Sequence, residues 1–362
     1  MRKESYEFLE KLLSTPSVSG HEQAIQRVVK RYVAHYADEV KVDVHGNLIA
    51  SYNPQGKTRV MLAGHCDQIG MMVTHIDDKG FIYFNQVGGI DAGVLPGSNV
   101  VVHAAQGPID GIIGKRPVHL LTQAERGKEM EIKKLWIDIG ATNGEEVKKK
   151  VAIGDVVTYL PGVKRLGSNQ ITAPGCDDRV GVFVVMEALR LVAQLARKSG
   201  GTKKKLPFSL FAVSTVQEEI GLRGATTATY SVDPLVGIAV DVTHASDNPG
   251  ADPKEFGTVK LGAGPTIARG PNINPVLEKL FVNTAKKKKI PYQPLGAPSA
   301  TGTDANVIQI SRCGVAAALI GLPNRYMHTQ VEVVDLRDLE NAARLIAESV
   351  LAISSRDTFI PS

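Results

Sequence analysis

The sequence is poor in cysteine, in aromatic residues and in long apolar runs, and each shortage excludes a class of protein. It has three cysteines and one tryptophan in 362 residues, and aromatic residues make up 5%. Three cysteines cannot form a paired framework, so a disulfide-stapled secreted fold is excluded and a reducing cytoplasm is expected. The longest uncharged apolar stretch, at 314–322, is too short to span a bilayer, so no membrane partner is expected.

A strong charge of one sign is also missing. The formal net charge is +5 at pH 7, and the lysines at 148–150, 203–205 and 286–289 form separate short runs without interleaved aromatic residues. Nucleic-acid surfaces concentrate their basic residues on one face or stripe. We therefore expect the lysine runs to be solvated and no nucleic-acid partner.

What the chain does contain is an alternation of helical and strand-like segments with an aliphatic core. Ser19 followed by Glu22 resembles a capping box that would begin a second helix. The alternation predicts an α/β fold. Helices are expected at 4–14, 179–196, 220–230, 275–289 and 336–353, a hairpin at 39–52, and buried strands at 59–63, 206–215, 235–242 and 314–322.

One stretch, residues 71–161, departs from this alternation. It contains short runs of alternating apolar and polar residues, separated by glycine, proline, aspartate and asparagine. That spacing is typical of a small all-β barrel or sandwich. We predict an inserted β domain at 71–161 within a main domain formed by 1–70 and 162–362.

Five short segments of the main domain each place a potential metal ligand just after an apolar run. Beyond the carboxyl ends of parallel strands, such side chains meet in one crevice. Mixed imidazole and carboxylate ligands suit zinc, cobalt or manganese, and this number of ligands suits two ions. The candidate ligands are His65, Asp177, Glu218 or Glu219, Asp241 and His328.

Three of the acidic residues have more specific expected roles. Asp177 is our choice for a carboxylate that bridges two ions about 3.5–4 Å apart. Asp67 lies two residues after His65 and is expected to accept the second imidazole N–H. Successive residues of an extended segment point opposite ways, so one residue of the pair Glu218 and Glu219 could bind metal while the other acts as general base toward a metal-bound water.

Each segment also has a purely structural interpretation. An isolated His-x-Asp is a weak signal, and Asp177 with Asp178 could only cap a helix. Cys66 and Cys176 stand beside candidate ligands, but we expect them to be small core residues. The coincidence of five segments favours the metal site.

Taken together, six segments resemble the signature motifs of the tetrahedral aminopeptidases, a family of dinuclear metallo-aminopeptidases with members named glutamyl aminopeptidase or cellulase. The resemblance extends over nearly the whole chain. The segments are GHCDQIG, APGCDDRVG, TVQEEIGLRGA, VDVTHASD, GTDAN and LPNRYMHTQVE.

The resemblance implies a phosphorylase/hydrolase-like mixed sheet flanked by helices, with a β-barrel insert that mediates dimerisation and dimers that assemble into a dodecamer. It implies that His65 and Asp241 serve one metal and Glu219 and His328 the other, that Asp177 bridges them, and that Glu218 is the proton acceptor. A cis peptide between Asp177 and Asp178 is also implied. The chain departs from the family pattern at Gln68, at 174–176 and at Thr301, and the departures at Gln68 and Thr301 bear on substrate preference.

The expected function is therefore a cytoplasmic aminopeptidase that uses two divalent ions to remove N-terminal residues from short peptides. Two alternatives stay open at this stage. One keeps the metals but acts on N-acyl amino acids or glycans, and the other is a non-catalytic assembly protein. The S1 preference is not predicted, because it depends on loops and on a neighbouring subunit.

Overall fold

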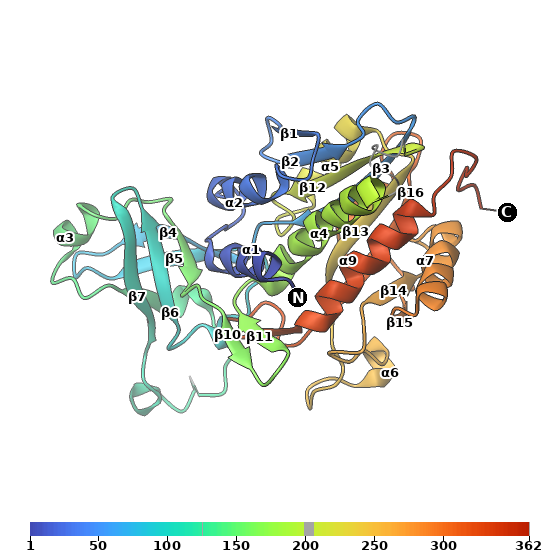
Figure 1. Cartoon of the computed structure of the whole chain (residues 1–362). Coiled ribbons are helices and arrows are strands. Elements are labelled where there is room, and N and C mark those ends of the chain that lie inside the picture. Colours follow the sequence, from blue (N-terminus) through green and yellow to red (C-terminus); the bar gives the residue numbers. More distant parts are fainter. Residues whose placement is uncertain (125, 199–205, 362) are drawn as a thin grey trace.

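The computed structural model describes residues 1–124, 126–198 and 206–361, and in it a helix-covered sheet carries a separate barrel (Figure 1). The lysines at 203–205 lie outside the described residues. Those at 148–150 and 286–289 are exposed, as predicted. Among the described helices, none is both long and apolar enough to cross a bilayer.

An eight-stranded mixed sheet forms the centre of the larger body. Its four central strands, β12, β3, β13 and β16, run parallel to one another, so their carboxyl ends share one edge. The strands in spatial order are β1 (Glu39–Val42), β2 (Leu48–Tyr52), β12 (Phe208–Thr215), β3 (Thr58–His65), β13 (Val236–His244), β16 (Ala316–Asn324), β14 (Thr266–Arg269) and β15 (Gln293–Gly296).

Successive side chains of a strand point to opposite faces of the sheet. In this sheet the side chains on both faces are apolar and both faces are buried. In β3, Leu62 belongs to the larger core cluster and Ala63 to the smaller one. The larger cluster lies under α1 (Lys3–Ser14), α2 (Gln23–Val33), α4 (Cys176–Lys198), α7 (Pro275–Lys288) and α9 (Leu336–Leu351). The smaller cluster lies under α5 (Arg223–Val232) and α8 (Ala305–Gln309).

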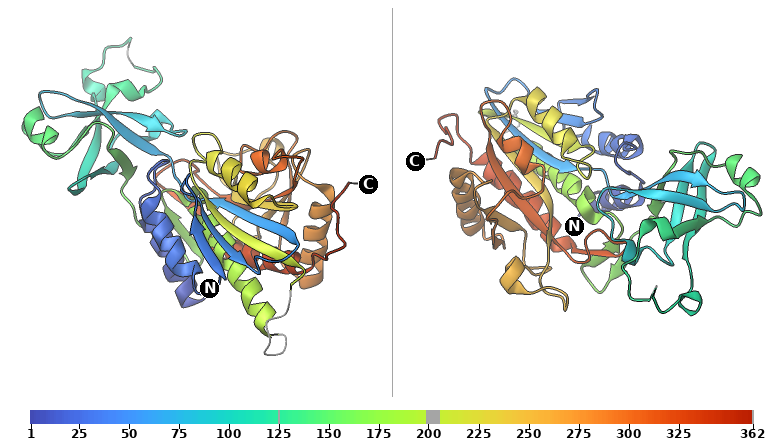
Figure 2. Two further views of the ribbon diagram at one scale, coloured as in Figure 1. Left: turned by 90° about the horizontal axis from the view of Figure 1, so that it is seen from above. Right: turned by 180° about the vertical axis from the view of Figure 1, so that it is seen from behind.

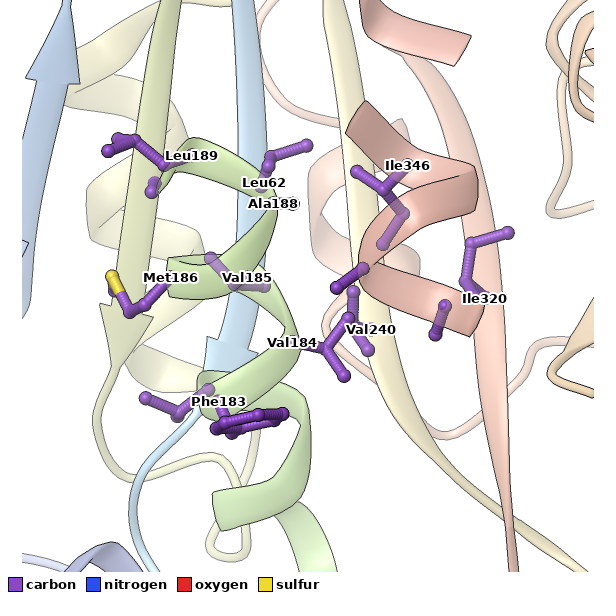
Figure 3. Close-up of a cluster of buried hydrophobic side chains, with 14 of the residues drawn as sticks. Leu62, Phe183, Val184, Val185, Met186, Ala188, Leu189, Val240, Ile320 and Ile346 are labelled. Carbon is purple, nitrogen blue, oxygen red and sulfur yellow. The ribbon is translucent and has the colours of Figure 1, made fainter. Parts of the chain in front are cut away.

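Helix α4 is the central helix of the larger cluster. Its apolar side chains, among them Val184 and Leu189, lie against strands β3, β13 and β16 and against α9 (Figure 3). Most of its residues are fully buried, which explains its almost continuous apolar sequence. The helix therefore anchors its own first residues, which include Asp177, to the sheet edge.

The insert is a closed barrel whose paired strands are all antiparallel, and it stands beside the sheet layer (Figure 2). It has its own apolar core and carries the short helix α3 (Gly144–Lys148). The predicted fold class, a mixed sheet flanked by helices with an inserted all-β barrel, is confirmed. In closed order the strands are β4 (Gly70–Ile76), β5 (Ile82–Val87), β8 (Leu135–Asp138), β7 (Gly107–Lys115), β6 (Asn99–Ala104) and β9 (Val156–Tyr159).

Some elements differ from the sequence prediction. The capping box is wrong: the Ser19 hydroxyl bonds Asp67, and α2 begins at Gln23 without a side-chain cap. Helix α5 begins at Arg223, later than predicted, because residues 218–222 form a turn. Unpredicted elements are the helices α3, α6 (Pro253–Phe256) and α8, the strands β14 and β15, and a small sheet of β10 (Lys164–Leu166), β11 (Gln170–Ala173) and β17 (Glu332–Asp335).

Candidate metal centre and active site

The candidate ligands meet in one cleft of about 310 Å³ at the carboxyl edge of the parallel strands. His65 ends β3, level with Thr215 at the end of β12, and Asp241 lies in the last part of β13. The convergence that the sequence predicted is thus present in the fold. The residues lining this cleft are His65, Asp177, Glu218, Glu219, Asp241, Val242, Thr243, His244, Thr301, Gly302, Thr303, Met327 and His328.

Asp177 lies between the two histidines. Its Oδ1 is 3.1 Å from Nε2 of His65, and its Oδ2 is 3.1 Å from Nε2 of His328. The two carboxylate oxygens therefore face different imidazoles. The peptide bond that follows Asp177 is cis, as the family resemblance implied.

Glu218 and Glu219 reach opposite sides of Asp177. The Oε2 atom of Glu218 is 3.7 Å from Nε2 of His65, whereas that of Glu219 is 3.6 Å from Nε2 of His328. The divergence was expected, but its cause is different from the one predicted. The segment is a turn and not an extended strand, since Gln217 has φ 54° and the N–H of Gly221 bonds the Glu218 carbonyl.

Asp67 is fully buried and fixes this turn. Its carboxylate accepts hydrogen bonds from the backbone N–H groups of Glu218 at 2.9 Å and Glu219 at 3.2 Å, and from the Ser19 hydroxyl at 2.7 Å. The Nδ1 atom of His65 is 3.1 Å from the Asp67 carbonyl oxygen and 3.5 Å from its carboxylate. The backbone oxygen thus makes the imidazole contact that we had expected of the carboxylate.

The electrostatics of the site are those of crowded, buried acids. Burial raises the pKa of Glu218 to about 10 and that of Asp241 to about 8, in each case against the opposing effect of His65. Burial alone would raise the pKa of Asp177 too, but hydrogen bonds from His328 and His65 hold it below its usual range. Four acids thus lie around the imidazoles of His65 and His328 in this cleft: Asp177, Glu218, Glu219 and Asp241.

These residues fit divalent cations. Two triads, His65 with Asp177 and Glu219, and His65 with Glu218 and Asp241, each bring three ligand atoms within 4.8 Å of one another. The Oε1 atom of Glu219 is buried and has no hydrogen-bond partner among the described residues. Buried carboxylates without partners are costly unless a cation or donor meets them.

Neither neighbouring cysteine offers a thiolate. Cys66 and Cys176 are fully buried in the larger core cluster, as predicted, and burial raises the pKa of both thiols. His244 is exposed and also lines the cleft. Thr301 lines it too, and its hydroxyl bonds Asn272.

Sequence reasoning missed several buried acids around the ligands. Asp178 accepts a hydrogen bond from the His65 N–H at 3.3 Å, and Glu332 accepts one from the Asp177 N–H at 2.8 Å. Asp304 accepts a hydrogen bond from the Thr215 hydroxyl at 2.7 Å. Asp304 lies in the motif segment GTDAN and Glu332 in the motif segment LPNRYMHTQVE, so the resemblance to the family was the sequence feature that could have identified both.

Comparisons with known proteins agree with this geometry. The family model described as M42 glutamyl aminopeptidase matches residues 46–345. The chain belongs to the M42 family. The lysyl aminopeptidase of Pyrococcus furiosus is 38% identical to this M42 chain over 345 residues, covering 94% of it and 95% of the relative.

Solved structures place this M42 chain among the TET aminopeptidases. The TET aminopeptidase of Thaumarchaeota archaeon SCGC AB-539-E09 has a TM-score of 0.91 and 34% identity, covering 97% of this chain and 98% of its own. The Pyrococcus horikoshii TET1 peptidase, which can assemble into a tetrahedron or a large octahedral shell, has a TM-score of 0.83 and 30% identity, covering 96% and 100%. The resemblance drawn from the motifs is confirmed.

Membership in the M42 family identifies the chain as an aminopeptidase, an enzyme that hydrolyses peptide bonds. The family also implies use of a divalent metal, which fits the two ligand triads.

Proposed function

We propose that this protein is a dinuclear metal-dependent aminopeptidase that removes N-terminal residues from short peptides. In this proposal His65 and Asp241 hold one ion and Glu219 and His328 hold the other. Asp177 bridges the two, Glu218 is the general base, and Asp67 positions the Glu218–Glu219 turn. The intact ligand set argues against the assembly-only alternative, and membership in the M42 aminopeptidase family favours peptides over N-acyl amino acids as substrates.

A single observation carries the proposal: one carboxylate presents a separate oxygen to each of two histidines. A ligand to one ion needs only one such oxygen, whereas a bridging carboxylate uses both. The Asp177 contacts to His65 and His328 have the same length, 3.1 Å, which supports bridging. When bound, the two cations would supply Lewis acidity, polarising the scissile carbonyl and making water easier to deprotonate.

Glu218 is placed to move the proton. It takes a proton from the attacking water and passes it to the departing amide nitrogen as the carbon–nitrogen bond breaks. Its Oε2 lies 3.7 Å from Nε2 of His65, beside the ligands assigned to the first ion. Glu219 is directed toward His328, with its Oε2 3.6 Å from Nε2 of that ring, and it is therefore assigned as a ligand.

The donor set indicates which metals to test. Two imidazoles with three carboxylates suit zinc, cobalt or manganese, whereas magnesium and calcium prefer shells made only of oxygen. We propose zinc or cobalt as the ions, with manganese as a further candidate.

The Glu218→Gln variant tests the proposal. It keeps the shape and an oxygen but removes the base, so we expect kcat on an aminoacyl p-nitroanilide to fall about 10²–10⁴-fold. Metal content, measured by elemental analysis, should stay at the wild-type value. Chelation should abolish wild-type activity and added zinc or cobalt should restore it.

Glu10→Gln on the exposed face of α1 is the control and should behave as wild type. Wild-type turnover by Glu218→Gln would disprove the general-base role. Acyl amino acids and β-glucans assayed beside the peptides test the two alternative substrate classes. Absence of bound metal from the active protein would refute the dinuclear site.

We further propose that residues 71–161 form a dimerisation domain, that 1–70 with 162–362 form the catalytic domain, and that dimers assemble into a dodecamer. The assembly of the Pyrococcus horikoshii TET1 peptidase supports this. So does a hollow on the barrel lined by Ile112 and Leu160, which are 52% and 53% exposed.

We place this activity in a reducing cytoplasm. Cys66, Cys176 and Cys313 are all free thiols, and Cys313 is exposed. A structural disulfide is typical of oxidising compartments, and none is formed by these three residues.

A further inference from the structure

A loop of the barrel, residues 88–98, passes directly beside the proposed metal centre. It joins β5 to β6. A Cβ added to Gly88 would lie 2.8 Å from Cγ2 of Ile69 and 3.4 Å from Cβ of Glu219, and one added to Gly89 would lie 3.5 Å from Nδ1 of His328. The barrel backbone therefore packs against both residues that we assign to the second ion.

His328 depends on this loop for its orientation. Its Nε2 faces Asp177 and Glu219, and its Nδ1 side lies beside the backbone of Gly89, where an added Cβ would be 3.5 Å from Nδ1. Its side chain is 35% exposed, whereas that of His65 is 2% exposed. Burial thus holds the ring of His65, whereas the partly exposed ring of His328 takes its orientation from the backbone of Gly89 beside it. Groups next to the second ring nitrogen commonly orient a metal-binding imidazole.

The loop in turn takes its position from the barrel. Ile90 and Leu95 belong to the barrel core, as does Ile69. The N–H of Gly97 bonds the carbonyl of Ile113 at 2.9 Å, which ties the end of the loop to β7. The two glycines at the metal centre therefore cannot move independently of the barrel.

We propose that loop 88–98 is a positioning element that the barrel supplies to the metal centre. It sets the ring of His328 and the side chain of Glu219, and so controls the affinity of the ion that they hold. The other ion, held by His65 and Asp241 on β3 and β13, does not depend on it. This inference rests on the dinuclear centre of the proposed function.

The chain offers a matched pair of variants for the test. Gly88 has φ +80° and Gly97 has φ +82°, so alanine strains the backbone equally at both. Only at Gly88 does the new methyl group meet neighbours, because nothing lies within 4 Å at Gly97. The two variants thus separate contact with the metal centre from strain in the loop.

Cobalt(II) binding to the metal-free full-length protein, measured by calorimetry, gives the readout. We expect the wild type to take up two ions. In Gly88→Ala, one of them should bind about 10- to 100-fold more weakly, the usual range when a group that orients a ligand is disturbed. Gly97→Ala should bind both ions as the wild type does.

A rescue variant ties the effect to one contact. Leucine lacks the Cγ2 atom that the new methyl group would meet, and exchange of isoleucine for leucine keeps the side-chain volume. Gly88→Ala combined with Ile69→Leu should recover most of the lost affinity. If Gly88→Ala does not fold, Gly89→Val replaces it. A Cβ at Gly89 already lies 3.5 Å from Nδ1 of His328, so the two further methyl groups of valine crowd the ring without a positive φ, and a loss at the same ion is expected.

Wild-type cobalt affinity in Gly88→Ala, or in Gly89→Val where that variant replaces it, would overturn the positioning role. An equal loss in Gly97→Ala would overturn it as well, because the cause would then be strain in the loop. Both of these results leave the aminopeptidase proposal intact. A wild type that takes up no cobalt removes the dinuclear centre itself and this inference with it.

Discussion

At the scale of single residues, the site is organised by groups that are not candidate ligands themselves. The carboxylate of Asp67 gathers the N–H groups of both Glu218 and Glu219, and in doing so forces the turn that sends the two side chains to different sides. An isolated Glu-Glu pair has no such preference. The proposed roles of base and ligand thus depend on Asp67, a residue that does not line the cleft.

Replacing this carboxylate by its amide makes the point testable. Asp67→Asn keeps one acceptor oxygen but turns an NH₂ group toward backbone donors, so one of the two N–H bonds must be lost. We expect metal affinity to fall about 10- to 100-fold and kcat to fall with it, measured by cobalt titration and by the p-nitroanilide assay. Ser19→Ala removes only the third donor and should have a smaller effect. Equal effects of the two variants would show that the turn does not depend on the carboxylate.

The sequence predicted the residues nearest to the proposed ions because each follows a recognisable apolar run. It did not predict Asp178 or Glu332, because their roles depend on backbone N–H groups in distant segments. Glu332 meets the Asp177 N–H only because β17 pairs with β11 just before the ligand. Both strands are four residues long, which is too short for a periodic signal.

At the scale of elements, the strand that precedes His328 is held by an ion pair that the catalytic proposal does not involve. Arg325 makes a bidentate contact with Asp247, at 2.9 and 2.7 Å, and the Leu261 N–H bonds the same carboxylate. Burial would raise the pKa of Asp247, but the hydrogen bonds from Arg325 and Leu261 lower it overall. The contact thus ties residue 325, just after β16, to the segment that follows β13.

The pKa of Asp247 is lower in the folded protein than in the unfolded chain. The contribution of Asp247 to the free energy of unfolding is therefore complete at pH values above its unfolded-state pKa, and it is lost as the pH falls through its folded-state pKa. We expect Asp247→Asn to reduce the free energy of unfolding by about 1–3 kcal/mol at pH 7, the usual worth of charge-assisted hydrogen bonds. The difference from wild type should shrink as the pH falls from 6 toward 3. Urea unfolding of both proteins across this range measures it.

Asp233→Asn is the control for this prediction. The Asp233 side chain is 49% exposed and pairs with Arg59 and Arg312 at the surface. Exposed ion pairs contribute only about 0–1 kcal/mol. A loss in Asp247→Asn that does not change with pH would mean that packing, and not charge, is what the substitution removes.

At the scale of the whole molecule, the sequence predicted most of the architecture. All six barrel strands and the four central sheet strands were expected, because each has a sustained apolar run or alternation. Strands β14 and β15 and the β10–β11 hairpin were missed. β14 and β15 have four residues each, and β10 is three exposed residues, so they form through pairing with neighbours and not through a pattern of their own.

The barrel also bears on how the molecule assembles. Ile112 and Leu160 line one hollow on its outside, together with Asp110 and Asp138. Each of these two apolar side chains is about half exposed in the single chain. Exposed apolar side chains gathered in a hollow of this kind are typical of surfaces that a partner covers.

A charge placed in this hollow should therefore weaken assembly without touching the cleft. In Ile112→Glu, the new carboxylate would have to be buried beside Asp110 and Asp138 when a second copy covers the hollow, which costs several kcal/mol. We expect light scattering after gel filtration to show wild type as a large oligomer and the variant as smaller species, with cobalt binding retained. Val44→Glu, on a fully exposed tip of the main domain, should leave the oligomer unchanged. An Ile112→Glu protein with the wild-type mass would place the interface elsewhere than this hollow.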